Sequence, residues 1–255
     1  VARSIAINHS DRMIGALVYG LNEYPPMEIM KLDEHLFVEW APLDVYGLGL
    51  YKRGYRDNFD LLAEQWHRIA PTLGYSNYLH WHRSRGCAQL APAPELIKLE
   101  FATLKRHGFQ SVREAVDPNW SYAGPNNWLL ARLMWKADAD VDALYREWLK
   151  LAYGGGAEAM GRIYALIDDA FRRFKQQDEP LHYSAGQYDI DKPKIVKIYL
   201  PLLSQVCTLC YEALKNATDE KSKKRVALFM ENLRFFQHEL IRAGYPRRAR
   251  VASKK

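Results

Sequence analysis

The sequence contains little cysteine, only three residues in 255. Cys207 and Cys210 form a C-x-x-C pair inside a predicted helix, LPLLSQVCTLCYEAL, with no second pair to accompany them. A structural zinc site needs four ligands, and a thioredoxin-type motif needs a strand-to-helix turn. We therefore expect Cys87, Cys207 and Cys210 to be core thiols. Cysteine content does not indicate the cellular compartment.

Long apolar runs are also missing. No run approaches the roughly 18 residues that a membrane-spanning helix requires. The first residues, VARSIAINHSDR, lack the apolar core of a signal peptide. Because 48% of the residues are nevertheless apolar and 13% are aromatic, the composition excludes a disordered chain. A chain of 255 residues can form one large domain or two ordinary ones.

The net charge of +6 does not form a basic patch. Residues 1–125 contain 13 Lys and Arg and 14 Asp and Glu, whereas the last nine residues, RRARVASKK, carry five positive charges and no negative charge. Nucleic-acid binders usually cluster basic residues on one face. The basic tail therefore favours a solvated terminus, and we expect neither a nucleic-acid partner nor a membrane partner.

Strand and helix patterns alternate in the first half of the chain. Apolar runs bounded by turn residues predict strands over residues 14–21, 36–41, 77–81 and 110–116, and helical periodicity predicts helices over 58–69 and 95–107. This rhythm is typical of parallel strands covered by helices. From residue 127 only helices are predicted, over 127–137, 140–152, 157–177, 192–216 and 220–243. The expected domains are 1–125, a helical domain over 126–246, and a basic, disordered tail over 247–255.

Two features of the helical half carry specific expectations. Trp128, Leu129, Leu133 and Trp135 recur at helical spacing, so we expect all four to pack in the core where the helical domain meets the strands. The run Gly154-Gly155-Gly156 follows a helix, whereas a phosphate-binding glycine loop follows a strand. The run therefore indicates a break between helices.

Several short motifs, taken in order, carry a resemblance to a known family. They are Tyr19 with Pro25-Pro26, Pro92-x-Pro94, Lys105 to Glu114, Trp128 to Trp135, and Tyr153-Gly154. Over roughly residues 14–175 the chain resembles a bacterial family known as a domain of unknown function, related to the glycoside hydrolase barrels of α-glucuronidases and β-hexosaminidases.

The resemblance implies a fold and a missing part. The expected fold class is α/β followed by all-α, as the second half of a (β/α)8 barrel with about four βα units and a C-terminal helical domain. A barrel closes with eight strands, so we expect this chain to be a fragment whose partner is the N-terminal half of the barrel. In the related barrels the acid/base machinery lies at the fourth strand, which would place the catalytic acid upstream of Val1. The resemblance also implies a secreted or periplasmic protein.

Barrel enzymes place their functional groups where strands end and in the loops that follow. Hydrolysis of a glycosidic bond usually needs two carboxyl groups, and the candidate catalytic residues are Glu23, Glu39 and Glu114. Glu114 also matches the glutamate that ends the last strand of the family's barrel. Aromatic rings and polar side chains that would bind a sugar are Tyr19, Asn22, Tyr24, Trp40, Asp44, His80, His82, Trp120 and Tyr122.

Three functions are consistent with these residues. The first is a glycoside hydrolase-like protein that acts on a carbohydrate without a cofactor or metal. The second is a non-catalytic carbohydrate-binding or scaffolding module. The third is a metal-dependent hydrolase using His80 and His82, which alternate and so would face the same way on a strand. Histidine-rich metal barrels need further ligands later in the chain, which disfavours the third.

Overall fold

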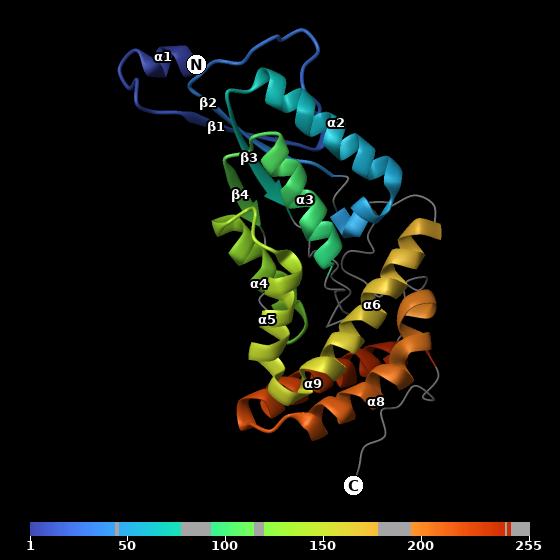
Figure 1. The fold of residues 1–255 in the computed structure, drawn as a ribbon. Helices are drawn as coiled ribbons and strands as arrows, with labels where there is room; N and C mark the ends of the chain where they lie inside the picture. Colours follow the sequence, from blue (N-terminus) through green and yellow to red (C-terminus); the bar gives the residue numbers. More distant parts are fainter. Residues whose placement is uncertain (44–45, 78–92, 115–119, 178–194, 243, 246–255) are drawn as a thin grey trace. The chain divides into compact units, whose positions relative to one another are not determined.

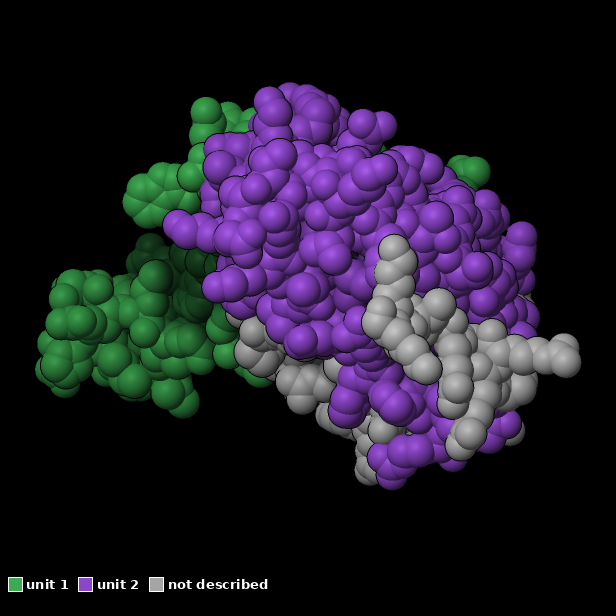
Figure 2. Space-filling model, turned by 90° about the horizontal axis from the view of Figure 1, so that it is seen from below, with its two compact units in different colours: residues 1–79, 95–115, 130–139 green, residues 80–94, 116–129, 140–255 purple. Residues whose placement is uncertain are grey.

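The computed structural model describes residues 1–43, 46–77, 93–114, 120–177, 195–242 and 244–245. The chain forms two compact units, coloured separately in Figure 2. Unit 1 contains Val1–Leu79, Glu95–Ala115 and Leu130–Ala139, and unit 2 contains His80–Pro94, Val116–Leu129 and Asp140–Lys255.

Unit 1 is built on a parallel sheet. The strands are β1 (Ile14–Tyr19), β2 (Leu36–Ala41), β3 (Thr72–Asn77) and β4 (Ser111–Glu114), and their spatial order follows the sequence, β1-β2-β3-β4. Every neighbouring pair is parallel. The prediction of four parallel strands alternating with helices is therefore confirmed for this unit.

Helices α2 (Arg53–Ile69) and α3 (Pro94–Arg106) connect β2 to β3 and β3 to β4. Crossovers between parallel strands are right-handed, and the strand order never reverses, so both helices fall on one face of the sheet (Figure 1). The side chains buried between the helices and the sheet form an aromatic and aliphatic core: Val38, Trp40, Phe59, Leu62, Trp66, Leu73, Tyr75, Ile97 and Phe101. The link from β1 to β2 contains only a short 3-10 turn, η1 (Gly20–Asn22).

Two elements in unit 1 differ most from the prediction, and the other predicted ones differ by no more than two residues at either end. The third strand is Thr72–Asn77, five residues before the predicted strand. Its small residues Gly74 and Ser76 alternate with Leu73 and Tyr75, so its apolar pattern is weak in the sequence although the neighbouring strands and helices bury it. Helix α2 begins at Arg53, five residues before the predicted start at residue 58, and Asp57 inside it pairs with Arg53 (3.5 Å).

Unit 2 is helical in the residues that the structure describes. Its main helices are α5 (Val141–Tyr153), α6 (Ala157–Gln177), α8 (Leu200–Asn216) and α9 (Glu220–Arg242), with the π-helical turn η5 (Ile195–Tyr199) before α8. Tyr164 of α6 lies in the centre, where its hydroxyl contacts that of Tyr153 (2.7 Å) and its ring meets Phe229 edge-on. Cys207 and Cys210 are free thiols on α8, and burial raises the pKa of Cys207 to about 11.

Helix α4 (Trp120–Trp135) corrects the expectation for the aromatic stripe. The helix runs through Pro125, whereas the predicted helix began at residue 127. Leu129 and Leu133 are buried as expected, but Trp135 is 93% exposed. At ~100° per residue, Trp135 lies about 200° round the helix from Leu133, on the opposite side.

The glycine run forms the 3-10 turn η3 (Gly154–Gly156) between α5 and α6. Gly154 has a φ of 53°, a conformation that favours glycine. The backbone of η3 packs directly against the last carbonyl groups of α8. In the described parts of the chain, none of the helices combines the length and apolar character needed to cross a membrane.

Candidate functional site

The carboxyl ends of the four strands lie along one edge of the sheet because all of them are parallel. The terminal residues are Tyr19, Ala41, Asn77 and Glu114. Loops that follow this edge carry the functional groups in open and closed parallel sheets alike. The edge and the sheet face that α2 and α3 leave uncovered are therefore the natural place to look for a site.

The uncovered face, which we call the open face, carries an aromatic ring and an ion pair. Alternation along β1 places Leu17 and Tyr19 there, and both are about half exposed. On the same face, Glu39 of β2 accepts a hydrogen bond from Arg113 of β4, with 2.5 Å between Oε1 and Nε. The Arg113 side chain is 61% exposed and that of Glu39 is 23% exposed. The pair is thus partly shielded from water on a face where Leu17 and Tyr19 are about half exposed.

Strand β3 leaves room for this pair because it contributes only small residues to the open face. Gly74 and Ser76 lie between β2 and β4, at the register positions of Glu39 and Arg113. A Cβ on Gly74 would lie 2.3 Å from Cζ of Phe37, so the ring occupies the space of a side chain. Small residues on β3 thus allow groups from β2 and β4 to meet across it.

Glu23 is buried and fastens the loop after β1. Its Oε2 accepts a hydrogen bond from the Leu43 backbone N–H (2.7 Å), beyond the end of β2. Its carbonyl oxygen accepts the indole N–H groups of Trp40 (3.1 Å) and Trp66 (2.9 Å). The bonds give Glu23 a clear structural role at the carboxyl edge, one that the sequence did not indicate.

Trp40 was expected to bind substrate, and the structure corrects this expectation. The residue is fully buried on the helix-covered face, stacked on Phe59 at a ring distance of 5.3 Å. Its neighbour Glu39 faces the open side because successive strand residues point to opposite faces. Trp40 is a core residue, out of reach of a substrate on the open face.

Glu114 lies on the helix-covered side of the edge. It is the register partner of Asn77, so the two side chains share that face, opposite to Glu39 and Arg113. Asn77 donates to Oε1 of Glu100 on α3 (2.5 Å), and the Tyr75 hydroxyl donates to the same oxygen. The predicted catalytic glutamates Glu39 and Glu114 are therefore on different faces of the sheet.

Sequence reasoning missed Glu100, although the sequence contains an indication of it. Leu96, Ile97, Phe101 and Leu104 form the buried stripe of α3, and Glu100 falls inside that stripe. A carboxylate within an apolar helical stripe is costly unless it is paired or protonated. Sequence reasoning also missed Arg113, because it selected the neighbouring Glu114 at the strand end. Only the strand register shows that Arg113 meets Glu39.

The remaining predicted residues are placed as follows. Asn22 and Tyr24 are exposed in the loop after β1. Trp120 is exposed at the start of α4, and Tyr122 lines an apolar pocket of unit 2 together with Tyr199, Phe229 and Phe236 of that unit. Asp44, His80 and His82 lie outside the described residues, so the metal hypothesis that rests on the two histidines stays a prediction. The described residues contain no group of three or more potential metal ligands.

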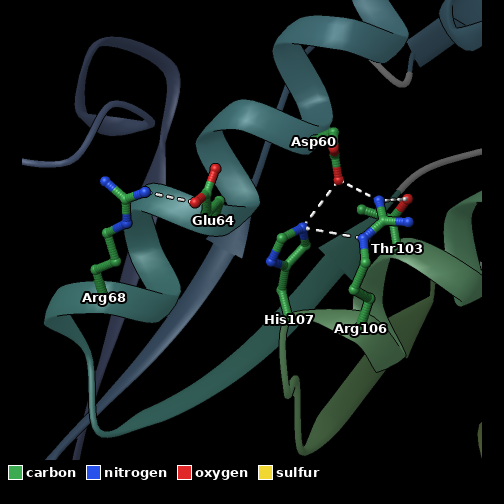
Figure 3. Close-up of polar contacts among 6 residues, drawn as sticks. All are labelled: Asp60, Glu64, Arg68, Thr103, Arg106 and His107. Atoms are coloured by element: carbon green, nitrogen blue, oxygen red, sulfur yellow. Dashed lines mark hydrogen bonds and ion pairs between the residues drawn. The ribbon is translucent and has the colours of Figure 1, made fainter.

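A second polar cluster joins α2 to the end of α3 (Figure 3). Oδ1 of Asp60 contacts Nε2 of His107 (2.8 Å) and also the guanidinium of Arg106. Burial raises the pKa of Asp60, but the hydrogen bonds from His107 and Arg106 lower it by more, so that the net shift is downward. The cluster lies between two covering helices, away from the open face, and we interpret it as a clamp between them.

Replacing Asp60 with asparagine is expected to reduce the free energy of unfolding by roughly 0.5–1 kcal/mol at pH 7, because the carboxylate is half exposed. The lowered pKa of Asp60 means that this contribution is present above its ordinary value of 3.8 and disappears as the pH falls through and below it. Urea denaturation from pH 7 to pH 3 measures the effect. Asp57→Asn, on the same helix, is the control and should change stability less. A difference between wild type and Asp60→Asn that persists at pH 3 would contradict the clamp.

Fold and site together define a class of protein: a parallel α/β sheet with helices on one face, polar groups on the other, and a further helical unit. A family model described as Domain of unknown function (DUF4838) matches residues 1–165. The chain belongs to this family. The match covers the whole sheet and extends into α6. No curated protein matches the chain, and no solved structure does.

Proposed function

We propose that this protein acts on carbohydrate and that the open face of the sheet is its sugar-binding surface, with a glycoside hydrolase-like reaction as the activity. The observation that supports the proposal is the ion pair of Glu39 and Arg113 on the same exposed face as Tyr19. The family resemblance drawn from the sequence motifs favours the same substrate class.

The chemistry of the open face suits a sugar. A half-exposed tyrosine ring such as Tyr19 can pack on the apolar C–H face of a pyranose. Glu39 offers a hydrogen-bond acceptor and Arg113 offers several donors beside it. A sugar hydroxyl can both donate and accept a hydrogen bond, so neighbouring hydroxyls can bond to both side chains. Because the two groups already pair with each other, they are held in place before a ligand arrives, which lowers the cost of ordering them.

Hydrolysis of a glycosidic bond usually requires a second carboxyl group, so that one carboxyl acts as the acid and the other, across the scissile bond, acts as the base or nucleophile. Among the described sheet residues, Glu39 is the carboxylate on the open face, since register places Glu114 on the other. We propose that the second carboxyl comes from the remainder of a barrel. Without it, the same surface would be a non-catalytic carbohydrate-binding module, which is the second candidate function.

The barrel itself is part of this proposal. Parallel sheets are normally covered on both faces, whereas Leu17 and Tyr19 remain exposed here. Strands β1 and β4 are the two edges of the described sheet. The outer backbone N–H and C=O groups of an edge strand can pair with a further strand. Four more βα units, supplied by the N-terminal half of a (β/α)8 barrel, would pair with both edges and turn the open face into the barrel interior.

Tyr19→Ala and Glu39→Gln are each expected to weaken carbohydrate binding at least tenfold, because each removes a group that would touch the sugar. Isothermal titration against oligosaccharides, selected first on a glycan array, measures the affinity. Trp135→Ala is the control, since it removes an exposed ring that is not on the sheet. Unchanged affinity in both sheet variants would show that the open face is not the sugar-binding surface.

Release of reducing sugar separates the two candidate functions. A glycoside hydrolase should release sugar from an oligosaccharide that it binds, and Glu39→Gln should reduce the release more than it reduces binding. Binding of the same oligosaccharides without any release, in protein that also contains the rest of the barrel, would identify the non-catalytic module.

A further inference from the structure

Glu100 is a fully buried carboxyl group in the middle of α3. Its Oε1 accepts two hydrogen bonds from β3, one from the Tyr75 hydroxyl and one from Asn77 Nδ2 (2.5 Å). Its Oε2 is also buried, and among the described residues it has no hydrogen-bond partner. One oxygen of this carboxyl is therefore satisfied twice and the other not at all.

This geometry favours the protonated acid. An ionised carboxylate needs donors on both oxygens, and a buried charge without them is strongly disfavoured. Protonation on Oε2 removes the charge and leaves both bonds to Oε1 intact. Burial raises the pKa of Glu100 to about 7, although the hydrogen bonds from Tyr75 and Asn77 act in the opposite direction. The charge of this group thus changes near neutral pH.

Among the described residues, the groups that donate hydrogen bonds to the carboxyl include no basic side chain. The groups that reach the carboxyl are Tyr75 and Asn77, both uncharged, and both belong to β3. By strand register, Glu114 of β4 lies beside Asn77. The basic residues in the last turn of α3, Lys105 and Arg106, are bonded to Asp138 and Asp60 respectively.

We propose that Glu100 is a proton-operated latch that holds α3 against the end of β3 when protonated and loosens that end of the sheet when ionised. Asn77 is the last residue of β3, and its register partner Glu114 is the last residue of β4. Opening of the latch would therefore free the carboxyl edge between β3 and β4. The inference concerns the fold of unit 1 and does not depend on the proposed sugar chemistry.

The direction of the pH effect follows from linkage. The pKa of Glu100 is higher in the folded chain than the ordinary value of 4.5, so the folded state binds more protons between pH 4.5 and 7. The contribution of Glu100 to stability is therefore most favourable below pH 4.5, falls as the pH rises, and levels off above about 7. Most paired carboxyl groups act in the opposite sense.

The test compares the full chain with Glu100→Gln, which has the shape of the neutral acid and cannot ionise. We expect Glu100→Gln to be as stable as wild type at pH 4 and to melt at a higher temperature than wild type at pH 8. Amide hydrogen exchange at Asn77 and Glu114, corrected for intrinsic rates, should accelerate from pH 6 to pH 8 in wild type and not in the variant. Glu95→Gln, exposed on the same helix, should behave as wild type.

A second measurement needs no variant. In wild-type protein labelled with 13C-glutamate, the carboxyl resonance of Glu100 should titrate near pH 7. Titration near pH 4.5, or parallel pH dependences of the melting temperature in wild type and Glu100→Gln, would overturn the latch.

Discussion

Replacing Trp40 with alanine is expected to destabilise unit 1 by about 3–5 kcal/mol, the usual loss for a buried aromatic side chain. Trp40 is fully buried, stacks on Phe59 and meets Tyr75 and Phe109 at tilted angles. Its indole N–H also donates to the Glu23 carbonyl oxygen. Removal of the ring would leave a cavity in the centre of the core and would free the loop after β1.

Trp135→Ala is the matched control for this prediction, because the same side chain is deleted at a position that is 93% exposed. Its effect should stay within about 0.5 kcal/mol. Guanidinium denaturation followed by circular dichroism measures both losses, and hydrogen exchange in β2 and β3 assigns the first to the sheet. Equal losses in the two variants would mean that Trp40 does not occupy the core of unit 1.

Gly155→Ala adds one methyl group to unit 2 and is expected to reduce its free energy of unfolding by about 2–3 kcal/mol. The new Cβ would lie 2.2 Å from the backbone oxygen of Asn216, the last residue of α8. At Gly156 the nearest atom is also backbone, the Ala213 oxygen at 2.7 Å. Because backbone atoms cannot rotate aside as a side chain does, α8 or η3 must shift.

Gly161→Ala on α6 provides the control in the same unit. Its Cβ would meet only a methyl group of Leu149, at 3.2 Å, which can move, and alanine favours a helix over glycine by about 1 kcal/mol. We expect unchanged or slightly higher stability. Thermal denaturation of both variants decides the matter: if Gly155→Ala melts at the wild-type temperature, η3 does not approach α8 as closely as described.

These glycines show what a sequence pattern can predict and what it cannot. The run at Gly154–Gly156 predicts a break between two helices, and the break is there. The pattern does not say that the break packs against residues 213–216, some sixty positions later, because contact between backbones depends on how the helices are arranged. Only that arrangement explains why alanine at position 155 should destabilise unit 2.

The candidate site, too, could be predicted from the sequence only in part. The polar residues after β1 and β2 are visible in the sequence, and Glu39 was predicted from its place on a strand. Its partner Arg113 lies 74 residues away and meets it only because β3 contributes Gly74 and Ser76 between them. Trp40, adjacent in sequence to Glu39, faces the opposite side and belongs to the core.

The sequence by itself determined the alternation of strands and helices in unit 1, the helical character of unit 2 and the family to which the chain belongs, since local periodicity and motif order carry that information. The tertiary structure decided the burial of particular side chains that the patterns did not settle. Trp135 is exposed because its helix turns it away from Leu133, and Glu100 is enclosed because its stripe faces β3. Burial depends on which other elements pack against a helix or strand, and the local sequence pattern of that element does not specify them.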